Sequence, residues 1–170
     1  MTPPTMKRED VEVFQVSIKA TPQAIWNAIT SPDWNGRYGY GSKGDYDLRP
    51  GGRYQVLPSQ AMKDYGSPDV IIDGEVIESD PPRRLVQTWR PLWDPETVAE
   101  GAKQLTWEIV EGADGVCTLT VTHELADAPK TRQMVTGAMK EAGGGWPMIL
   151  GDLKRLLETG ASAVTDQQQA

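Results

Sequence analysis

The sequence predicts a single α+β domain in which helices pack on one face of an antiparallel sheet. Three observations favour this class. One series of strand segments occupies the middle of the chain, an amphipathic helix closes it, and only one short helix separates the first strand from the others. The chain has 170 residues, 38% of them hydrophobic, which is enough for one domain with a substantial core.

The N-terminal segments predict a strand followed by a short helix. Apolar and polar side chains alternate from Phe14 to Ala20, with the period of a half-buried strand. Thr21 can cap the helix that follows, and Pro22 suits its first position because that position needs no N–H donor. The helix ends before Pro32, since proline disfavours helical geometry in the residue before it.

Six further strand segments follow, so we expect a sheet of about six to seven strands. Gly51 and Gly52 fit a hairpin turn between the first two, because glycine adopts positive φ freely. The pair Pro81-Pro82, the segment 91–101 and the glycine-containing turn at 112–115 separate the later ones. The expected strands are Asp45–Leu48, Arg53–Leu57, Val70–Glu78, Arg84–Arg90, Gln104–Val110 and Cys117–Glu124.

Two helices are expected at the C-terminal end. The first is a modest helix over Lys130–Ala142, and a glycine triplet separates it from the second. The second helix has apolar residues at helical spacing, is roughly 20 Å long and stops at Gly160. Its apolar stripe consists of Trp146, Leu150, Leu153 and Leu157, and Ile149 and Leu156 widen it.

The domain boundaries follow from the polar ends of the chain. Residues 1–10 are expected to form a flexible N-terminus and residues 161–170 a flexible C-terminal tail, because neither has apolar periodicity. Residues 11–160 are expected to form the single domain. We find no internal repeat that would indicate a second one.

Composition excludes several classes of protein. A net charge of −7 argues against sequence-independent nucleic-acid binding and against a polybasic membrane surface. No apolar run approaches the roughly 20 residues of a membrane-spanning helix. A single cysteine, Cys117, and the lack of an apolar signal segment favour a cytoplasmic location. A single histidine, His123, leaves too few ligands for a zinc site, and we expect no metal and no cofactor.

Five segments of the chain form an ordered series over roughly residues 11–159: VSIKATPQAIWNAIT, LRPGGRY, GEVIESDPPRRLVQTWR, LTWEIVEGADGVCTLTVTHEL and GGWPMILGDLKRLLETG. The most specific parts are Gly-x-Val-x-x-x-x-Pro-Pro-x-x-Leu and the closing Gly-Trp-x-x-x-Leu-x-x-Leu. The series resembles the family named for the activator of heat-shock protein 90 ATPase homologue. That family belongs to the SRPBCC superfamily, also called START-like or birch-pollen-allergen-like.

The resemblance implies a helix-grip fold. In this fold a curved antiparallel sheet wraps around the long C-terminal helix and leaves a cavity between the two. Members of the superfamily bind lipids, sterols, hormones or polyketides, and some are cyclases or aromatases. The family name therefore implies a fold more strongly than an activity.

Strand parity predicts the wall of this cavity, because alternate residues of each strand point to the same face. The inward set is mostly apolar, with Gln87 and His123 as polar exceptions, and it also includes Val70 and Ile149. Apolar enclosure with a few polar groups is typical of a small-molecule pocket, and the alternative is that these residues fill a solid core. The expected ligand-binding residues are Ile72, Val76, Gln87, Trp89, Leu105, Trp107, Leu119, Val121, His123, Trp146, Leu150 and Leu153.

Two smaller groups have competing interpretations. His123 either binds a ligand or acts as an acid or base, or it is a half-buried histidine bonded to a backbone carbonyl or to a carboxylate such as Glu108. The structural role is favoured, because the sequence offers no nucleophile or orienting partner, and no catalytic residue is assigned.

Four tyrosines near a glycine-rich stretch either line the cavity mouth or, as favoured here, pack among surface loops. These are Tyr38, Tyr40, Tyr46 and Tyr54.

The leading hypothesis is non-catalytic binding of a small apolar or amphipathic molecule between the sheet and the C-terminal helix. One alternative is a cyclase-, aromatase- or hydrolase-type enzyme in the same pocket. Another is a chaperone-cofactor-like interaction module that uses its surface. The expected partners are thus a small hydrophobic or amphipathic ligand and either a chaperone or a second copy in a homodimer, with no nucleic acid and no membrane span.

Overall fold

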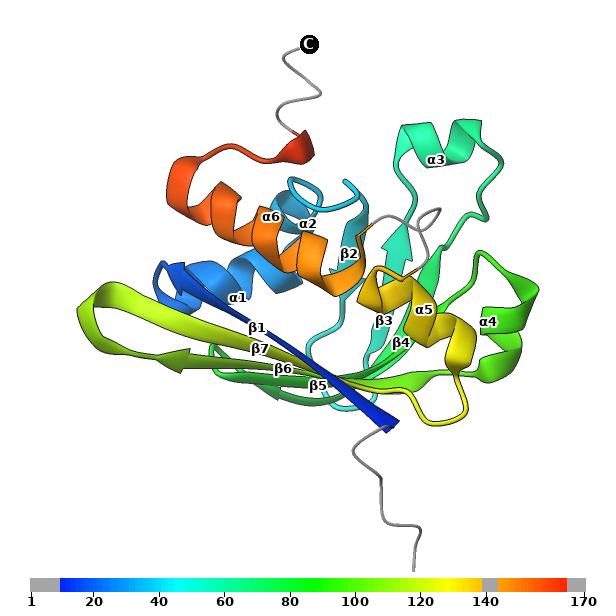
Figure 1. Cartoon of the computed structure of the whole chain (residues 1–170), viewed down its shortest axis with the longest axis horizontal. Helices are drawn as coiled ribbons and strands as arrows, with labels where there is room; N and C mark the ends of the chain where they lie inside the picture. Colours follow the sequence, from blue (N-terminus) through cyan, green and yellow to red (C-terminus); the bar gives the residue numbers. More distant parts are fainter. Residues whose placement is uncertain (1–9, 139–143, 165–170) are drawn as a thin grey trace, which may run out of the picture.

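The computed structural model describes residues 10–138 and 144–164. One curved antiparallel sheet of seven strands forms a layer, and helices cover one of its faces (Figure 1). The strand order is β1-β7-β6-β5-β4-β3-β2, which confirms the predicted α+β class and the helix-grip architecture. The strands are β1 (Val11–Lys19), β2 (Lys43–Tyr46), β3 (Arg53–Leu57), β4 (Ile72–Asp80), β5 (Arg84–Pro91), β6 (Lys103–Glu111) and β7 (Val116–Glu124).

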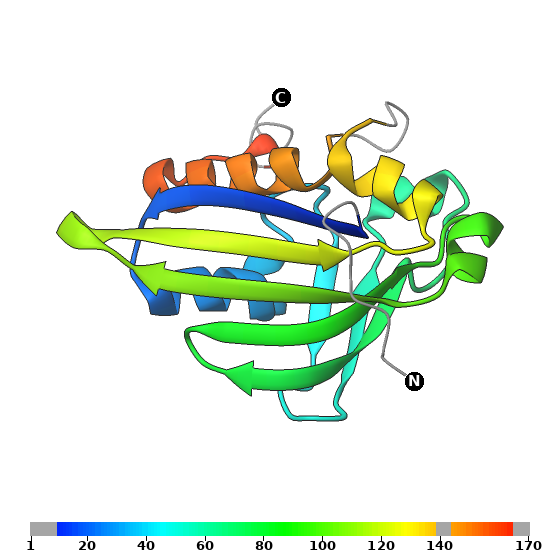
Figure 2. The same cartoon turned by 60° about the horizontal axis from the view of Figure 1, so that its bottom comes forward.

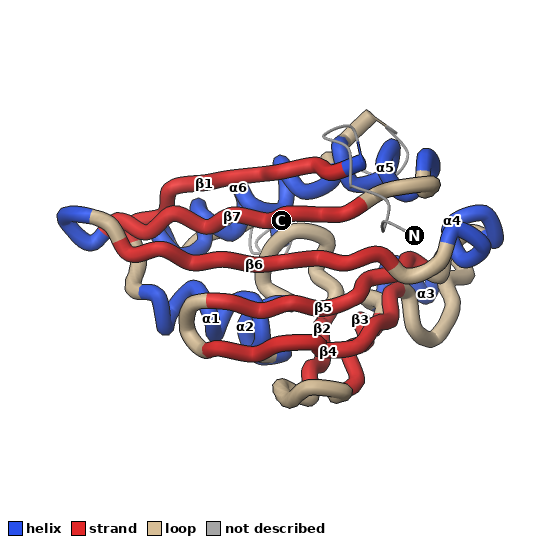
Figure 3. The backbone as a smooth tube through the Cα atoms, turned by 90° about the horizontal axis from the view of Figure 1, so that it is seen from below, coloured by secondary structure: helices blue, strands red, loops and turns tan. Residues whose placement is uncertain are grey.

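The first two strands lie at opposite edges of the sheet. Helices α1 (Pro22–Thr30) and α2 (Pro32–Asn35) carry the chain from one edge to the other, and the remaining strands then pair in sequence order. As predicted, the Thr21 hydroxyl accepts a hydrogen bond from the Ala24 amide at 3.1 Å and caps α1. Seen from below in Figure 3, the strands lie in front of α1, α2 and α6, so these helices share one face of the sheet.

Helix α6 (Gly145–Thr159) packs on the concave face and also protects an edge of the sheet. It runs along β1 in Figure 2. Lys154 Nζ donates to the Ser17 carbonyl at 2.5 Å, and Glu158 accepts from the Lys19 amide at 2.9 Å. These bonds occupy backbone groups that an edge strand otherwise exposes to unwanted pairing. The buried stripe of α6 comprises Trp146, Leu150, Leu153 and Leu156.

The turn between β2 and β3 is longer than the predicted hairpin. Strand β2 ends at Tyr46, not at Leu48, so residues 47–52 form the connection. Gly52 is required there, because a Cβ at this position would lie 2.0 Å from the Asp47 carbonyl oxygen. Gly51 has φ of 83°, a value that favours glycine.

Three helical segments differ from the predicted ones. Helix α5 (Pro129–Thr136) ends where Gly137 adopts φ of 83°, and the predicted continuation over 139–142 lies outside the described residues. Two further short helices, α3 (Gln60–Asp64) and α4 (Pro95–Glu100), lie in segments predicted as connections. They are too short to show apolar periodicity in the sequence. Among the described helices, none has the length and apolar character needed to cross a membrane.

Candidate functional site

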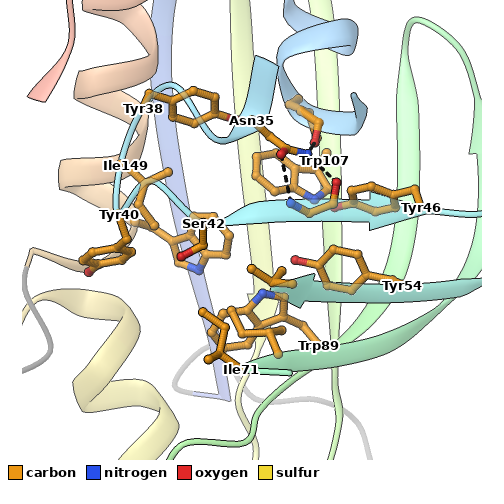
Figure 4. A pocket seen from close by; sticks show the side chains of 16 residues that line it. Asn35, Tyr38, Tyr40, Ser42, Tyr46, Tyr54, Ile71, Trp89, Trp107 and Ile149 are labelled. Atoms are coloured by element: carbon orange, nitrogen blue, oxygen red, sulfur yellow. Dashed lines mark hydrogen bonds between the residues drawn. The ribbon is translucent and has the colours of Figure 1, made fainter. Parts of the chain in front are cut away.

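A cavity of about 140 Å³ lies between the sheet, the loop after α2 and the first turns of α6 (Figure 4). Its aromatic lining comes from segments far apart in the sequence. None of its lining side chains carries a formal charge. The lining tyrosines are Tyr38, Tyr40, Tyr46 and Tyr54, and the lining tryptophans are Trp89, Trp107 and Trp146.

A buried amide holds two of these rings in place. Gln87 has no exposed surface, because β5 directs it inward between Leu85 and Trp89. Its Oε1 accepts hydrogen bonds from the Tyr46 hydroxyl at 2.7 Å and from Trp107 Nε1 at 3.0 Å. One acceptor therefore fixes the orientation of a tyrosine and a tryptophan in the cavity wall.

The buried tyrosines remain protonated at neutral pH. Burial raises the pKa of Tyr38, Tyr46 and Tyr54 above the ordinary value of 10.0. The Tyr38 hydroxyl also donates to the Ala28 carbonyl at 2.8 Å, which anchors the loop to α1. The phenol groups of the wall are thus neutral hydrogen-bonding groups.

His123 lies behind the tryptophans and not on the cavity surface. It is fully buried, and its Nδ1 accepts a hydrogen bond from Trp146 Nε1 at 3.1 Å. This bond requires an unprotonated Nδ1, so a neutral ring carries its proton on Nε2, which has no hydrogen-bond partner among the described residues. Burial lowers the pKa of His123 to about 3, so the imidazole is neutral at physiological pH.

The interpretation of His123 as a half-buried histidine bonded to a backbone carbonyl or to a carboxylate is therefore wrong. The residue is fully buried, not half-buried, and its partner is an indole, not a carbonyl or a carboxylate. Glu108 faces the other side of the sheet, where it forms an ion pair with Arg84 at 3.2 Å. With its low pKa, His123 lacks the neutral-pH titration that an acid–base role requires.

The structure places the predicted residues in three positions. On the cavity surface lie Ile72, Trp89, Trp107 and Trp146. Gln87 and His123 lie outside the cavity lining and accept hydrogen bonds from Trp107 and Trp146. Buried in the core, outside the cavity lining, are Val76, Leu105, Leu119, Val121, Leu150 and Leu153.

The inward parity of β5, β6 and β7 is confirmed, and that of β4 is only partly correct. Val70 precedes β4, and Ile71 takes a buried position on the cavity in its place. A register shift between Val76 and Glu78 then breaks the simple alternation. A bulge of this kind leaves no clear mark in the sequence.

The tyrosine group is where the favoured sequence interpretation is wrong. Tyr38 and Tyr54 are 7% and 6% exposed and face the cavity, whereas Tyr40 is 39% exposed at its rim. The alternation of Tyr54 and Val56 in β3 is the sequence signal that could have indicated an inward face. The loop that carries Tyr38 has no such periodicity.

Two polar side chains fix the loop that forms the cavity mouth. Asn35 accepts from the Gly44 amide at 2.9 Å and donates to the Gly44 carbonyl at 2.7 Å. Asp152 of α6 accepts from the Gly39 amide at 2.8 Å and from the Ala163 amide at 2.9 Å. Residues 161–164, assigned to the tail from the sequence, thus pack against this loop, and Ser162 is buried.

The sheet, the gripping helix and the cavity between them define a helix-grip protein of the α+β class. The chain belongs to the family described as Activator of Hsp90 ATPase homolog 1-like protein, whose model matches residues 19–158. The resemblance found in the sequence is thereby confirmed. No curated protein matches the chain.

Several solved structures are similar to the chain. DynU16, a putative protein in the dynemicin biosynthetic locus, is 27% identical with a TM-score of 0.63, and the match covers 89% of this chain and 48% of that one. PFC0360w, an HSP90 activator from Plasmodium falciparum, is 19% identical with a TM-score of 0.61 and coverages of 87% and 96%. The Aha1 dimer from Colwellia psychrerythraea is 16% identical with a TM-score of 0.62 and coverages of 88% and 97%. The last two likenesses concern the fold alone.

Proposed function

We propose that the protein binds a small apolar or amphipathic molecule in the cavity between the sheet and α6. The observation that carries this proposal is a cavity of about 140 Å³ with an aromatic wall, inside a domain whose other core residues are closely buried. Protein interiors normally contain few voids larger than a water molecule. An apolar enclosure with a few polar groups is the usual form of a small-molecule site.

The chemistry of the wall supports binding without catalysis. Gln87 Oε1 already accepts two hydrogen bonds, and His123 Nδ1 accepts one. The low pKa of His123 keeps it from exchanging protons near neutral pH. An enzyme of the cyclase, aromatase or hydrolase type is the alternative, and turnover that disappears in His123→Ala would support it instead.

A filling substitution tests the binding proposal directly. Val56 lines the cavity and is 7% exposed, so Val56→Phe places a ring in the space that a ligand needs. Val110→Phe is the matched control, because Val110 is 61% exposed. We expect native mass spectrometry after mild extraction to show a bound small molecule on the wild type and the control, and none on a folded Val56→Phe variant. A wild type that carries no ligand and gives no saturable tryptophan-fluorescence change with apolar compounds would contradict the proposal.

A protein partner is the second candidate. Two similar structures are those of an HSP90 activator and of an Aha1 dimer, and β1 is an edge strand on which Val13 is 60% exposed. Helix α6 engages the backbone of β1 at Ser17 and Lys19, near the end of the strand, so pairing of the preceding part of β1 with a second copy would extend the sheet. Light scattering would then show a dimer that Val13→Lys disrupts and Val110→Lys, an equally exposed position on β6, does not. A monomeric wild type would contradict the homodimer, and failure to bind a purified chaperone would contradict the chaperone.

A further inference from the structure

We infer that the cavity takes a compound with no negative charge, a single aromatic ring and one small hydrogen-bond acceptor. This inference rests on the proposed binding function and narrows it to a class of ligand. It combines the volume of the cavity, the fixed orientation of its walls, the lack of charge in its lining and the buried Tyr54 hydroxyl.

The volume sets the number of rings. A closed apolar cavity of about 150 Å³ in another protein holds benzene, and the cavity here, which opens at its mouth beside Tyr40, has about 140 Å³. The tryptophan walls cannot simply turn aside to admit a second ring. Trp107 and Trp146 pack edge to face at 5.2 Å between centroids, and their indole nitrogens donate to Gln87 and His123.

The lining sets the charge of the ligand. No lining side chain is an acid or a base with a formal charge, and burial keeps Tyr38, Tyr46 and Tyr54 in their neutral form. A carboxylate in this cavity would lose its water without gaining an opposite charge, and the electron-rich faces of the aromatic wall would not attract it. Such a transfer is strongly unfavourable, so a ring compound with a negative charge is excluded from the site.

The hydrogen bonds already made by the lining residues determine which polar group the ligand can carry. The Asn35 side chain is engaged by the backbone of Gly44, the Tyr38 hydroxyl donates to Ala28, and the Tyr46 hydroxyl donates to Gln87. Tyr54 is the remaining buried tyrosine of the lining, its ring lies 4.4 Å from that of Tyr46, and its hydroxyl has hydrogen-bonding contacts with the side chains of Tyr46, Gln87 and Trp89. The Trp89 indole can only donate to the Tyr54 oxygen, so the phenolic proton of Tyr54 is not used by that contact. A hydroxyl proton rotates to suit its neighbours, so Tyr54 can donate to an ether or carbonyl oxygen of a bound ring.

Three probe compounds separate these requirements by calorimetry. Anisole has one ring and an ether oxygen, benzoate has the same ring with a charge, and 2-methoxynaphthalene has the same ether with a second ring. We expect anisole to bind saturably at one site, and the other two to bind at least about tenfold more weakly. Tyr54→Phe should weaken anisole binding several-fold and leave benzene binding unchanged, because only anisole loses a hydrogen bond.

An enlarged cavity provides the matched control for size. Ile149 of α6 lines the cavity, whereas Leu157 packs against the core on the same helix outside the lining. Ile149→Ala should therefore gain binding of 2-methoxynaphthalene, and Leu157→Ala should not. Tighter wild-type binding of benzoate or 2-methoxynaphthalene than of anisole would overturn this inference and leave the proposed function standing. No saturable binding of any apolar probe, together with no ligand in native mass spectrometry, would overturn both.

Discussion

The two ends of the concave face are filled in different ways. Toward the β6–β7 turn the interior is aliphatic, and Ile18, Ile25, Leu119 and Leu153 have no exposed surface. We call this part the aliphatic half. Toward the start of α6 the interior consists of large rings around a cavity, and we call this part the aromatic half. Its defining residues are Tyr46, Tyr54, Trp89, Trp107 and Trp146.

The difference shows how one sheet combines a solid core with a hollow site. Aliphatic side chains have no directional bonds, so they adjust until the space between helix and sheet is filled. Three rings of the aromatic half, Tyr46, Trp107 and Trp146, are held by hydrogen bonds to Gln87 and His123, and they cannot move inward to close the gap without breaking those bonds. Buried polar groups therefore keep the cavity open.

The largest effect is expected from a charge in the aliphatic half. Leu153→Asp places a carboxylate against the sheet where the wild-type side chain is fully buried, at a cost of several kcal/mol. We expect insoluble or molten protein by near-ultraviolet circular dichroism. Gly151→Asp is the control on the same helix, since no neighbouring atom lies within 4 Å of the added Cβ. A Leu153→Asp protein that melts within a few degrees of the wild type would show that the aliphatic half is not the solid core.

The second effect is a pH dependence that originates in the aromatic half. The pKa of His123 falls from 6.5 to about 3 on burial, so below pH 6.5 the unfolded chain binds a proton that the folded protein excludes. The free energy of unfolding should fall by up to about 1.4 kcal/mol per pH unit as the pH drops from 6.5 toward 3, with no such contribution above 6.5.

Two measurements isolate this contribution. His123→Gln keeps an acceptor for Trp146 but does not titrate, so urea unfolding of this variant should lose the histidine part of the slope. The chain contains a single histidine, so its ring protons can be followed by NMR without overlap from another. Titration of those signals in the folded protein between about pH 5 and 8 would contradict the buried, neutral imidazole.

A smaller effect is expected from removing the shared acceptor. Gln87→Leu leaves the Tyr46 hydroxyl and Trp107 Nε1 without their common partner, which should lower the free energy of unfolding by about 2 to 4 kcal/mol. Tyr46→Phe should cost about 1 kcal/mol, because Gln87 then keeps its bond to Trp107. Chemical denaturation measures both, and equal losses would show that the shared acceptor is not what holds the rings.

The smallest expected effect is a difference in the rate at which a thiol reagent labels the aliphatic half and the aromatic half. Cys117 is 1% exposed in the aliphatic half, and burial raises the pKa of its thiol, so a thiol reagent should label the folded protein slowly and the denatured chain quickly. Ser42→Cys in a Cys117→Ala background places a thiol on the cavity lining instead. It should react faster than Cys117 in the folded state. Equal rates would remove the distinction between a solid and a hollow half.

The sequence by itself determined the class, the parity of β5, β6 and β7, and the buried face of α6. These features repeat every two residues along a strand or every three to four along a helix, so Leu119, Val121 and Leu153 could be placed inside from local pattern alone. The resemblance of the ordered segments added the family and the helix-grip topology, which the structure and the family match bear out.

Only the tertiary structure decided which inward residues surround a cavity and which fill the core. Leu105 and Trp107 share one face of β6, yet the first is core and the second is cavity wall. That difference depends on what lies opposite each of them, and it is set by contacts between segments far apart in the chain. Tyr38 reaches the site from a loop without periodicity, and His123 acquires its low pKa from neighbours on β5 and α6. Packing and desolvation are properties of the assembled interior, so no local pattern carries them.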